Sequence, residues 1–236
     1  MSNVYESGEY FRNTGKTWHS EDSPWKAKQI VQIIQDNQIQ PRTIVEVGCG
    51  AGHILVELSK NDVLQNCEFK GFDISQQAIE ICDVNAKNCE FYCQDYVAQD
   101  IVNLTVPDIL LVVDVFEHVP DYLGFIEKCK DRAKFKIYHI PLDIHVSGVL
   151  RNSFINTRSN LGHLHYFTAD SALATLRDTG HEILDCSYTD GSLGLFKQHP
   201  SIKRAIGNIP RYLLSKFSVP ITARIFGGYS LLVLTK

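Results

Sequence analysis

The feature that most constrains the fold is a glycine-rich turn between a hydrophobic strand and a helix. Residues 43–47 are β-branched and apolar apart from Glu46, which is typical of a buried strand. Glycine occupies every second position of the following turn, 48–52, and a helix is expected to begin near Ile54. Glycines permit a tight turn and the close approach of a ligand to bare backbone, and the free N–H groups of the helix start favour an anionic ligand group.

Strands and helices alternate through most of the chain, which predicts an α/β fold with a parallel sheet. A Ser-Pro pair at 23–24 is typical of a helix start, and Pro41 ends that helix. The strands are expected over 43–47, 69–74, 90–93, 108–113, 135–140, 182–188 and 229–234. The strand over 108–113 is nearly all apolar and is therefore expected to be central in the sheet. The further helices are expected over 54–58, 76–85, 120–131 and 168–179.

Two long connections interrupt the alternation, one over 141–167 and one over 190–226. Long loops at the carboxyl ends of parallel strands are well placed to form a lid over an active site. We therefore expect a single domain, 1–236, with an N-terminal cap segment 1–25, a lid over 141–167 after the fifth strand, and a basic insertion over 190–226.

Length, charge and cysteine usage favour one cytoplasmic domain. The chain has 236 residues and a net charge of −4, which gives no overall electrostatic footprint for nucleic acid. The polar stretch 1–10 lacks the apolar core of a signal peptide, and no stretch is apolar enough for a membrane span. None of the seven cysteines forms a CxxC pair, so reduced thiols are expected. The sequence is silent on oligomeric state.

Acidic side chains end three of the expected strands. Asp73 follows the glycines by about 20 residues, where a carboxylate can accept two hydrogen bonds from a ribose diol. Asp95 at the end of the third strand can accept from an adenine amine while Tyr96 stacks, and Asp114 ends the fourth. Each carboxylate alone could be a helix cap or turn residue. Polar groups at several ends of one sheet are harder to explain by capping.

These segments together resemble the class I S-adenosylmethionine-dependent methyltransferase family, in its small-molecule branch. The resemblance covers about residues 24–190 and the last strand. The segments that carry it are 46–52, Asp73, 95–96, 114–119 and 162–168. It implies a three-layer Rossmann-like α/β fold with a seven-stranded, mostly parallel sheet and an antiparallel last strand. It also implies methyl transfer from S-adenosyl-L-methionine to a small molecule, by O- or N-methylation, with S-adenosyl-L-homocysteine as product.

The resemblance also implies roles for individual residues. The turn glycines back the methionine portion, Glu46 orients its amino group, Asp73 holds the ribose, and residues 95–96 frame the adenine. Asp114 and the backbone after it close the site near the sulfonium. The expected cofactor-binding residues are Glu46, Gly48, Cys49, Gly50, Gly52, Asp73, Ile74, Asp95, Tyr96, Asp114 and Val115.

The acceptor side is less constrained. An oxygen acceptor needs a base, and histidine titrates near neutral pH. The candidate bases are His165 and His163, followed by His118; hydrogen bonding to the lid backbone is the alternative role for the first two. The acceptor-site candidates are Tyr10, Trp18 and His19, from an aromatic-rich segment, and His145. The spacing of Asp143, His145, His163 and His165 matches no recognised set of metal ligands, so no metal is expected.

The insertion 190–226 carries a net charge of +5 in a chain that is otherwise negative. Its apolar residues recur at near-helical spacing, interrupted by Pro210. A basic amphipathic segment, here 197–224, can lie on an anionic membrane or receive a phosphorylated or lipid-linked acceptor. The alternative is a solvated outer face over a packed inner one.

Three other functions fit parts of the same pattern. A nucleotide-dependent dehydrogenase is disfavoured, because its fingerprint spaces the glycines differently and has no role for the acid at 46. A non-catalytic module that binds S-adenosylmethionine would keep the same pocket. A nucleic-acid base methyltransferase is disfavoured because the fourth strand is followed by Asp-Val-Phe-Glu over 114–117 rather than by an Asn/Asp-Pro-Pro-Tyr motif. No nucleic-acid partner is expected.

Overall fold

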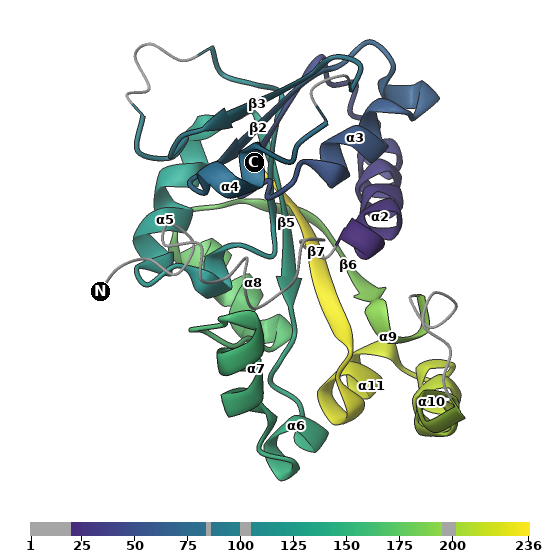
Figure 1. Cartoon of the computed structure of the whole chain (residues 1–236). Helices are drawn as coiled ribbons and strands as arrows, with labels where there is room; N and C mark the ends of the chain where they lie inside the picture. Colours follow the sequence, from purple (N-terminus) through teal and green to yellow (C-terminus); the bar gives the residue numbers. More distant parts are fainter. Residues whose placement is uncertain (1–19, 84–85, 100–104, 195–201) are drawn as a thin grey trace.

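The structure is a computed structural model that describes residues 20–83, 86–99, 105–194 and 202–236 (Figure 1). The acceptor-site candidates Tyr10, Trp18 and His19 lie outside these residues, together with most of the N-terminal segment.

A seven-stranded sheet runs through the centre of the molecule (Figure 1). Its strands are β1 (Thr43–Val47), β2 (Glu68–Asp73), β3 (Cys89–Cys93), β4 (Ile109–Val113), β5 (Phe135–Pro141), β6 (Ile183–Asp190) and β7 (Tyr229–Thr235). The order across the sheet is β3-β2-β1-β4-β5-β7-β6. The pairs among β1 to β5 are parallel, and β7 runs antiparallel to both β5 and β6. The expected fold, a mostly parallel sheet with an antiparallel last strand, is confirmed.

Strand β4 shows why the sheet has a layer of helices on each face. Its side chains alternate between the faces, and all five residues are buried. Leu110 and Val112 join one apolar cluster, whereas Ile109, Leu111 and Val113 join the cluster on the opposite face. An almost wholly apolar strand is therefore stable only in the middle of a doubly covered sheet. Its predicted central position is confirmed.

Helices on both faces complete the three layers (Figure 1). The helical elements are η1 (Ser20–Asp22), α2 (Ser23–Asp36), α3 (His53–Ser59), η2 (Asp62–Leu64), α4 (Gln76–Ile79), η4 (Phe116–His118), α5 (Tyr122–Cys129), η5 (Lys130–Arg132), α6 (Val146–Leu150), α7 (Ser153–Leu161), α8 (Ala169–Asp178), α9 (Gly191–Gly194), α10 (Ile202–Ser215) and α11 (Val219–Phe226). Ile34 of α2 and Leu55 of α3 belong to the cluster on one face. Ile126 of α5 and Leu176 of α8 belong to the cluster on the other.

Two expected helices are shorter in the structure. The helix predicted over 76–85 ends at Ile79, because the next backbone N–H groups bond only three residues back: Ile81 to the Ala78 carbonyl at 3.3 Å and Cys82 to the Ile79 carbonyl at 3.1 Å. The helix predicted over 120–131 begins at Tyr122, since the carboxylate of Asp121 accepts a hydrogen bond from the Gly124 N–H at 3.0 Å and so caps it.

The two long connections are partly helical rather than open loops. The lid contains α6 and α7, and the insertion contains α9, α10 and α11. They gather at the lower end of the molecule in Figure 1, near the carboxyl end of β5. A hydrogen bond from Ser147 Oγ to the Phe226 carbonyl, 3.2 Å long, joins the two connections. Within the insertion, Arg211 Nη2 donates to the same carbonyl at 3.0 Å. No helix within the described residues is both long enough and apolar enough to span a membrane.

Candidate functional site

Two adjoining pockets lie at the carboxyl ends of β1, β2 and β4. The first has a volume of about 400 Å³ and the second about 290 Å³. Four residues line both of them: Gly48, Gly50, Asp114 and His118. The pockets therefore form one cleft whose shared wall is the glycine turn and the end of β4. This is the position where open α/β sheets bind their ligands.

The glycine turn shapes the shared wall with bare backbone. Gly48, Gly50 and Gly52 have φ angles of 70°, 53° and 73°, a region that favours glycine. A Cβ at position 48 would lie 2.7 Å from Cγ2 of Val115, and one at position 52 would clash with the ring of Phe91. Larger residues would strain the turn and fill the space beside it.

Asp73 lies at the end of β2, where it fixes the turn and faces the second pocket. Its Oδ2 accepts a hydrogen bond from the Gly50 N–H at 2.9 Å, and its Oδ1 accepts one from the Ser75 N–H at 2.8 Å. Burial raises the pKa of this carboxyl, although the hydrogen bonds from the backbone oppose the shift. With Ile74 it lines the second pocket. Asp73 thus has a structural role in addition to any contact with a ligand.

Asp95 and Tyr96 also line the second pocket. Oδ1 of Asp95 accepts hydrogen bonds from the backbone N–H groups of Val97 at 3.0 Å and Ala98 at 3.1 Å, so this carboxylate fixes a turn. The ring of Tyr96 is almost fully buried, with its centroid 4.8 Å from that of Phe72. An apolar wall with a carboxylate at its edge suits a flat heterocycle that carries an amine.

Glu46 is the buried acid of the first pocket. Its side chain is 1% exposed, and its Oε2 has no hydrogen-bond partner within the described part of the chain. Burial raises the pKa of this carboxyl well above its usual range, while the nearby charge of Lys26 opposes the shift. A buried carboxylate oxygen without a partner is costly, so a ligand that donates a hydrogen bond there would be stabilising.

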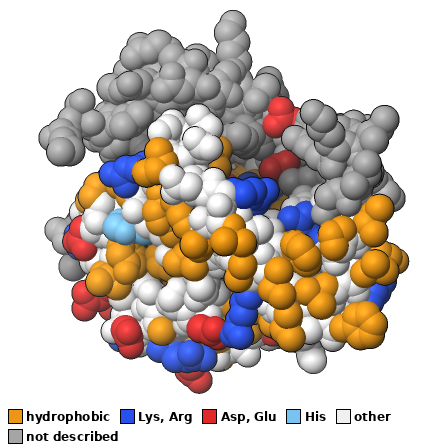
Figure 2. All heavy atoms as spheres, turned by 90° about the horizontal axis from the view of Figure 1, so that it is seen from below, with side chains coloured by type: hydrophobic (Ala, Val, Ile, Leu, Met, Phe, Trp, Pro, Cys, Tyr) orange, Lys and Arg blue, Asp and Glu red, His pale blue; other side chains and the backbone are white. Residues whose placement is uncertain are grey.

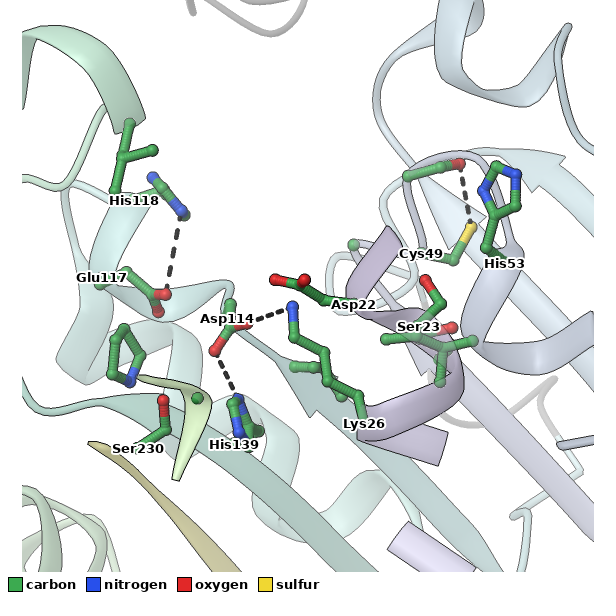
Figure 3. Close-up of a pocket in the computed structure, with 18 of the residues that line it drawn as sticks. Asp22, Ser23, Lys26, Cys49, His53, Asp114, Glu117, His118, His139 and Ser230 are labelled. Carbon is green, nitrogen blue, oxygen red and sulfur yellow. Dashed lines mark hydrogen bonds and ion pairs between the residues drawn. The ribbon is translucent and has the colours of Figure 1, made fainter. Parts of the chain in front are cut away.

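A charged network joins three elements in the first pocket (Figure 3). Lys26 Nζ on α2 lies 2.8 Å from Asp114 Oδ2, and His139 Nδ1 on β5 lies 2.6 Å from Asp114 Oδ1. The His139 Nε2 lies 3.0 Å from the Thr189 hydroxyl. Burial alone would raise the pKa of Asp114, but interaction with His139 and Lys26 outweighs it and lowers the pKa. Sequence reasoning missed Lys26, because one lysine on an expected helix carries no signal of its partner.

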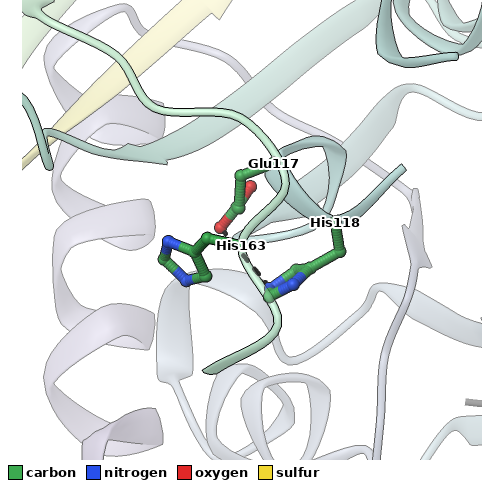
Figure 4. Close-up of side chains that lie close together, drawn as sticks. All are labelled: Glu117, His118 and His163. Atoms are coloured by element: carbon green, nitrogen blue, oxygen red, sulfur yellow. Dashed lines mark ion pairs between the residues drawn. The ribbon is translucent and has the colours of Figure 1, made fainter. Parts of the chain in front are cut away.

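A second cluster contains Glu117, His118 and His163 (Figure 4). Glu117 is fully buried, neither of its carboxylate oxygens makes a hydrogen bond within the described residues, and burial raises its pKa well above the usual range. Burial lowers the pKa of His118 to about 4. Nδ1 of His163 lies 2.6 Å from Asp143 Oδ2. The three side chains offer ligand atoms within 4.8 Å of one another, so these residues could hold a metal ion. The expectation from the sequence that the protein binds no metal therefore stays a prediction.

The four candidate histidines within the described residues fall into two groups. His118 and His163 line the first pocket. His165 and His145 are not among the residues that line either pocket. Nε2 of His165 bonds to the backbone carbonyl of Val119 at 3.0 Å, and Nδ1 of His145 accepts the Gly148 N–H at 3.0 Å as the cap of α6. The structure thus brings two of the four to the cleft.

Comparison with known proteins assigns the fold to a family. A methyltransferase-domain family matches residues 20–185, which is more than half of the chain. Ubiquinone biosynthesis O-methyltransferases of Coxiella burnetii are 29% identical over 111 residues, which are 45% of this chain and 44% of those proteins. The match thus spans less than half the length of these curated relatives.

Two solved structures show the same fold at low identity. The magnesium protoporphyrin IX methyltransferase of Synechocystis, with bound S-adenosylhomocysteine, aligns with a TM-score of 0.61 and 13% identity over 98% of this chain and 95% of that one. A phosphoethanolamine N-methyltransferase of Haemonchus contortus aligns with a TM-score of 0.60 and 12% identity over 88% of this chain and 52% of that one.

The sheet order, the glycine turn and the cleft define a Rossmann-like methyltransferase fold of class I. The chain belongs to the class I S-adenosylmethionine-dependent methyltransferase family.

Proposed function

We propose that this protein transfers a methyl group from S-adenosylmethionine to a hydroxyl or amine of a small molecule. The observation that carries the proposal is the continuous cleft of two adjoining pockets, lined by the glycine turn, by Asp73 and by Glu46, whose Oε2 has no hydrogen-bond partner within the described residues. Membership in the methyltransferase family and the similarity to O-methyltransferases support it.

The residues of the cleft suit the cofactor in their chemistry. Glu46 offers a buried oxygen to an ammonium group, and Lys26 in the same pocket offers a positive charge to a carboxylate. An amino-acid end carries both of these groups. In the second pocket, Asp73 can accept from ribose hydroxyls, and the wall formed with Asp95 and Tyr96 suits adenine. When bound, the cofactor supplies the electrophilic methyl group, so the protein's main task is to position two reactants and exclude water.

The pair of Asp143 and His163 suits the removal of a proton from a hydroxyl acceptor. The Asp143 carboxylate lies 2.6 Å from Nδ1 of His163, and both residues line the first pocket. A carboxylate at that nitrogen favours the tautomer that leaves Nε2 as the acceptor. We therefore assign the base to His163 rather than to His165, and we favour O-methylation.

Titration with S-adenosylhomocysteine tests the cofactor site. Asp73→Ala should weaken binding by about 10- to 100-fold, because it removes the carboxylate expected to meet the ribose. Asp108→Ala is the matched control: the Asp108 carboxylate also accepts backbone N–H groups, from Arg42 at 2.8 Å and Thr43 at 3.2 Å, but lies outside both pockets. Undetectable binding by the folded wild type would refute the proposal.

Turnover tests the reaction and the base separately. Production of S-adenosylhomocysteine is measured with panels of small phenols and amines. For a phenol that turns over, His163→Asn should lower kcat by about 100-fold or more while the affinity for S-adenosylhomocysteine stays unchanged. His165→Asn is the control, since its ring lies outside the pocket linings. Tight cofactor binding without turnover of any acceptor would favour a non-catalytic binding module.

A further inference from the structure

We propose that the end of the molecule formed by α6, α7, α10 and α11 docks onto an anionic lipid bilayer. The docking face comprises the exposed side chains of residues 144–158 and 208–225. This inference does not depend on the proposed reaction, because attachment to lipid needs neither the cofactor nor an acceptor.

The docking face concentrates the exposed apolar side chains of the protein. It carries eleven of the seventeen large hydrophobic residues that are exposed in the described structure. The two most exposed are Phe217 at 87% and Leu150 at 81%. The others are Ile144, Val146, Val149, Ile155, Ile209, Tyr212, Leu213, Ile221 and Ile225. Figure 2, a view from below, shows apolar side chains gathered at this end of the molecule. Such a concentration marks an interaction site.

The charge of the docking face has one sign. Residues 144–169 and 191–236 contain no aspartate or glutamate. Within the described structure, the exposed bases on the face include Arg151, Lys216 and Arg224. Of the acids that flank the face along the chain, Asp143 pairs with His163 and lines the first pocket, and Asp170 lies at the edge, 2.6 Å from Arg224. In Figure 2, Lys and Arg side chains lie between the apolar ones. Apolar residues interspersed with bases, without acids, are typical of helices that lie in the interface of an anionic membrane.

The same charge pattern argues against a second copy of this chain as the partner. Two copies joined through this face in a symmetric dimer would bring bases against bases with no acid between them. Like charges brought together across an interface oppose association, whereas anionic lipid headgroups complement them. The apolar side chains would at the same time reach the region between headgroups and acyl chains.

The helices of the face are held together, so they can act as one surface. The Ser147 hydroxyl of α6 and the Arg211 guanidinium of α10 both donate to the Phe226 carbonyl at the end of α11. Arg211 Nε also donates to the Gly227 carbonyl at 3.1 Å. The apolar side chains are therefore presented from a fixed arrangement, which lowers the cost of ordering them on a bilayer.

The face also adjoins the cleft. Leu161 at the end of α7 and Gly191 at the start of α9 line the first pocket, where the acceptor is proposed to bind. These residues belong to the same two connections that form the docking face. A docked protein would therefore hold the acceptor end of its cleft close to the bilayer, where an amphiphilic acceptor is concentrated.

Vesicle co-sedimentation of the full chain tests the proposal. Phosphatidylcholine vesicles in which about one lipid in three is phosphatidylglycerol are compared with vesicles of pure phosphatidylcholine. The protein should sediment with the anionic vesicles and at least tenfold less with the neutral ones. Leu150→Ser with Phe217→Ser should weaken this binding by about 100-fold, because each apolar side chain contributes to insertion. Val63→Ser with Leu184→Ser is the matched control, since these residues are 52% and 42% exposed but lie outside the docking face.

Each outcome decides the question. Failure of the wild type to bind anionic vesicles would overturn the proposal, as would an equal loss in the control pair. A wild-type dimer that becomes monomeric in the Leu150→Ser, Phe217→Ser variant, without vesicle binding, would assign the face to self-association instead. S-Adenosylhomocysteine affinity measured in solution should be unchanged in both pairs, and this separates failure of docking from failure of the cofactor site.

Discussion

Replacement of Gly48 by alanine should destabilise the protein through two separable effects. The first is the backbone conformation: at a φ of 70°, an L-residue with a Cβ costs about 1–2 kcal/mol. The second is the clash with Val115, whose Cγ2 would lie 2.7 Å from the new Cβ. Valine is stiff at χ1 and cannot swing away, so overpacking adds about 1–3 kcal/mol. The expected total for Gly48→Ala is about 3 kcal/mol.

A double-mutant cycle with Val115→Ala isolates the clash. Val115→Ala alone removes two methyl groups from a half-buried site and should cost about 1 kcal/mol. In that background the Cβ at position 48 meets no branched side chain, so only the backbone cost remains. The double variant should therefore be about 1–2 kcal/mol more stable than the sum of the single changes predicts.

Urea unfolding, followed by far-ultraviolet circular dichroism, measures all four free energies. Gly180→Ala is the matched control: its φ is 83°, but its Cβ would meet chiefly the flexible end of Lys130, at 3.0 Å. It should cost only the backbone term and show no coupling to Val115→Ala. Additivity of Gly48→Ala and Val115→Ala would refute the account of the shared wall, because the clash would then contribute nothing.

Three further predictions concern the charged groups. In urea unfolding, Lys26→Met should lower the free energy of unfolding by about 2 kcal/mol, less than for a fully buried ion pair, because the Asp114 side chain keeps 26% of its surface exposed. With Asp114→Asn added, the loss should be smaller than the sum of the two single losses. Burial lowers the pKa of His181 to about 4, so between pH 6.5 and 4 the unfolded chain binds more protons and stability falls as the pH falls. His181→Gln should remove about 1.5 kcal/mol of the difference in unfolding free energy between pH 6.5 and 5, and an unchanged difference would contradict this. A base formed by Asp143 and His163 needs no metal, so turnover should survive EDTA treatment and dialysis within twofold; a loss restored by a divalent cation would instead assign a metal to the cluster.

The sheet could be predicted from the sequence because the patterns that mark its strands and turns lie within short segments. An apolar run such as Ile109–Val113 must be covered on both faces, which predicts the central place of β4. The glycines over 48–52 predict the tight turn after β1. Both predictions use short segments of sequence. The ends of helices were less predictable. At Ile79 the chain tightens into turns instead of continuing the helix, and the apolar spacing carries no signal of that change.

The acceptor side was less predictable because it is built from long-range contacts. His163 and His165 are two residues apart and equivalent by spacing, yet the first meets Asp143 in the cleft and the second bonds to a backbone carbonyl. The difference depends on how the lid folds back over η4. Lys26 likewise gains its role only when α2 packs beside the end of β4. Sequence spacing alone predicts neither the contact of His163 with Asp143 nor that of Lys26 with Asp114.

Asp114 shows how the cleft combines strain with support. Its φ is 53°, a left-handed conformation that a residue with a side chain adopts at a cost of about 1 kcal/mol or more. Lys26 and His139 bond to its two carboxylate oxygens, one each, and so hold the side chain from different elements. A strained backbone persists only where its surroundings over-determine it. The wall between the two pockets is therefore set jointly by α2, β4 and β5, so substitutions of Lys26 or His139 should alter S-adenosylhomocysteine affinity through the position of Asp114 as well as through their own charge.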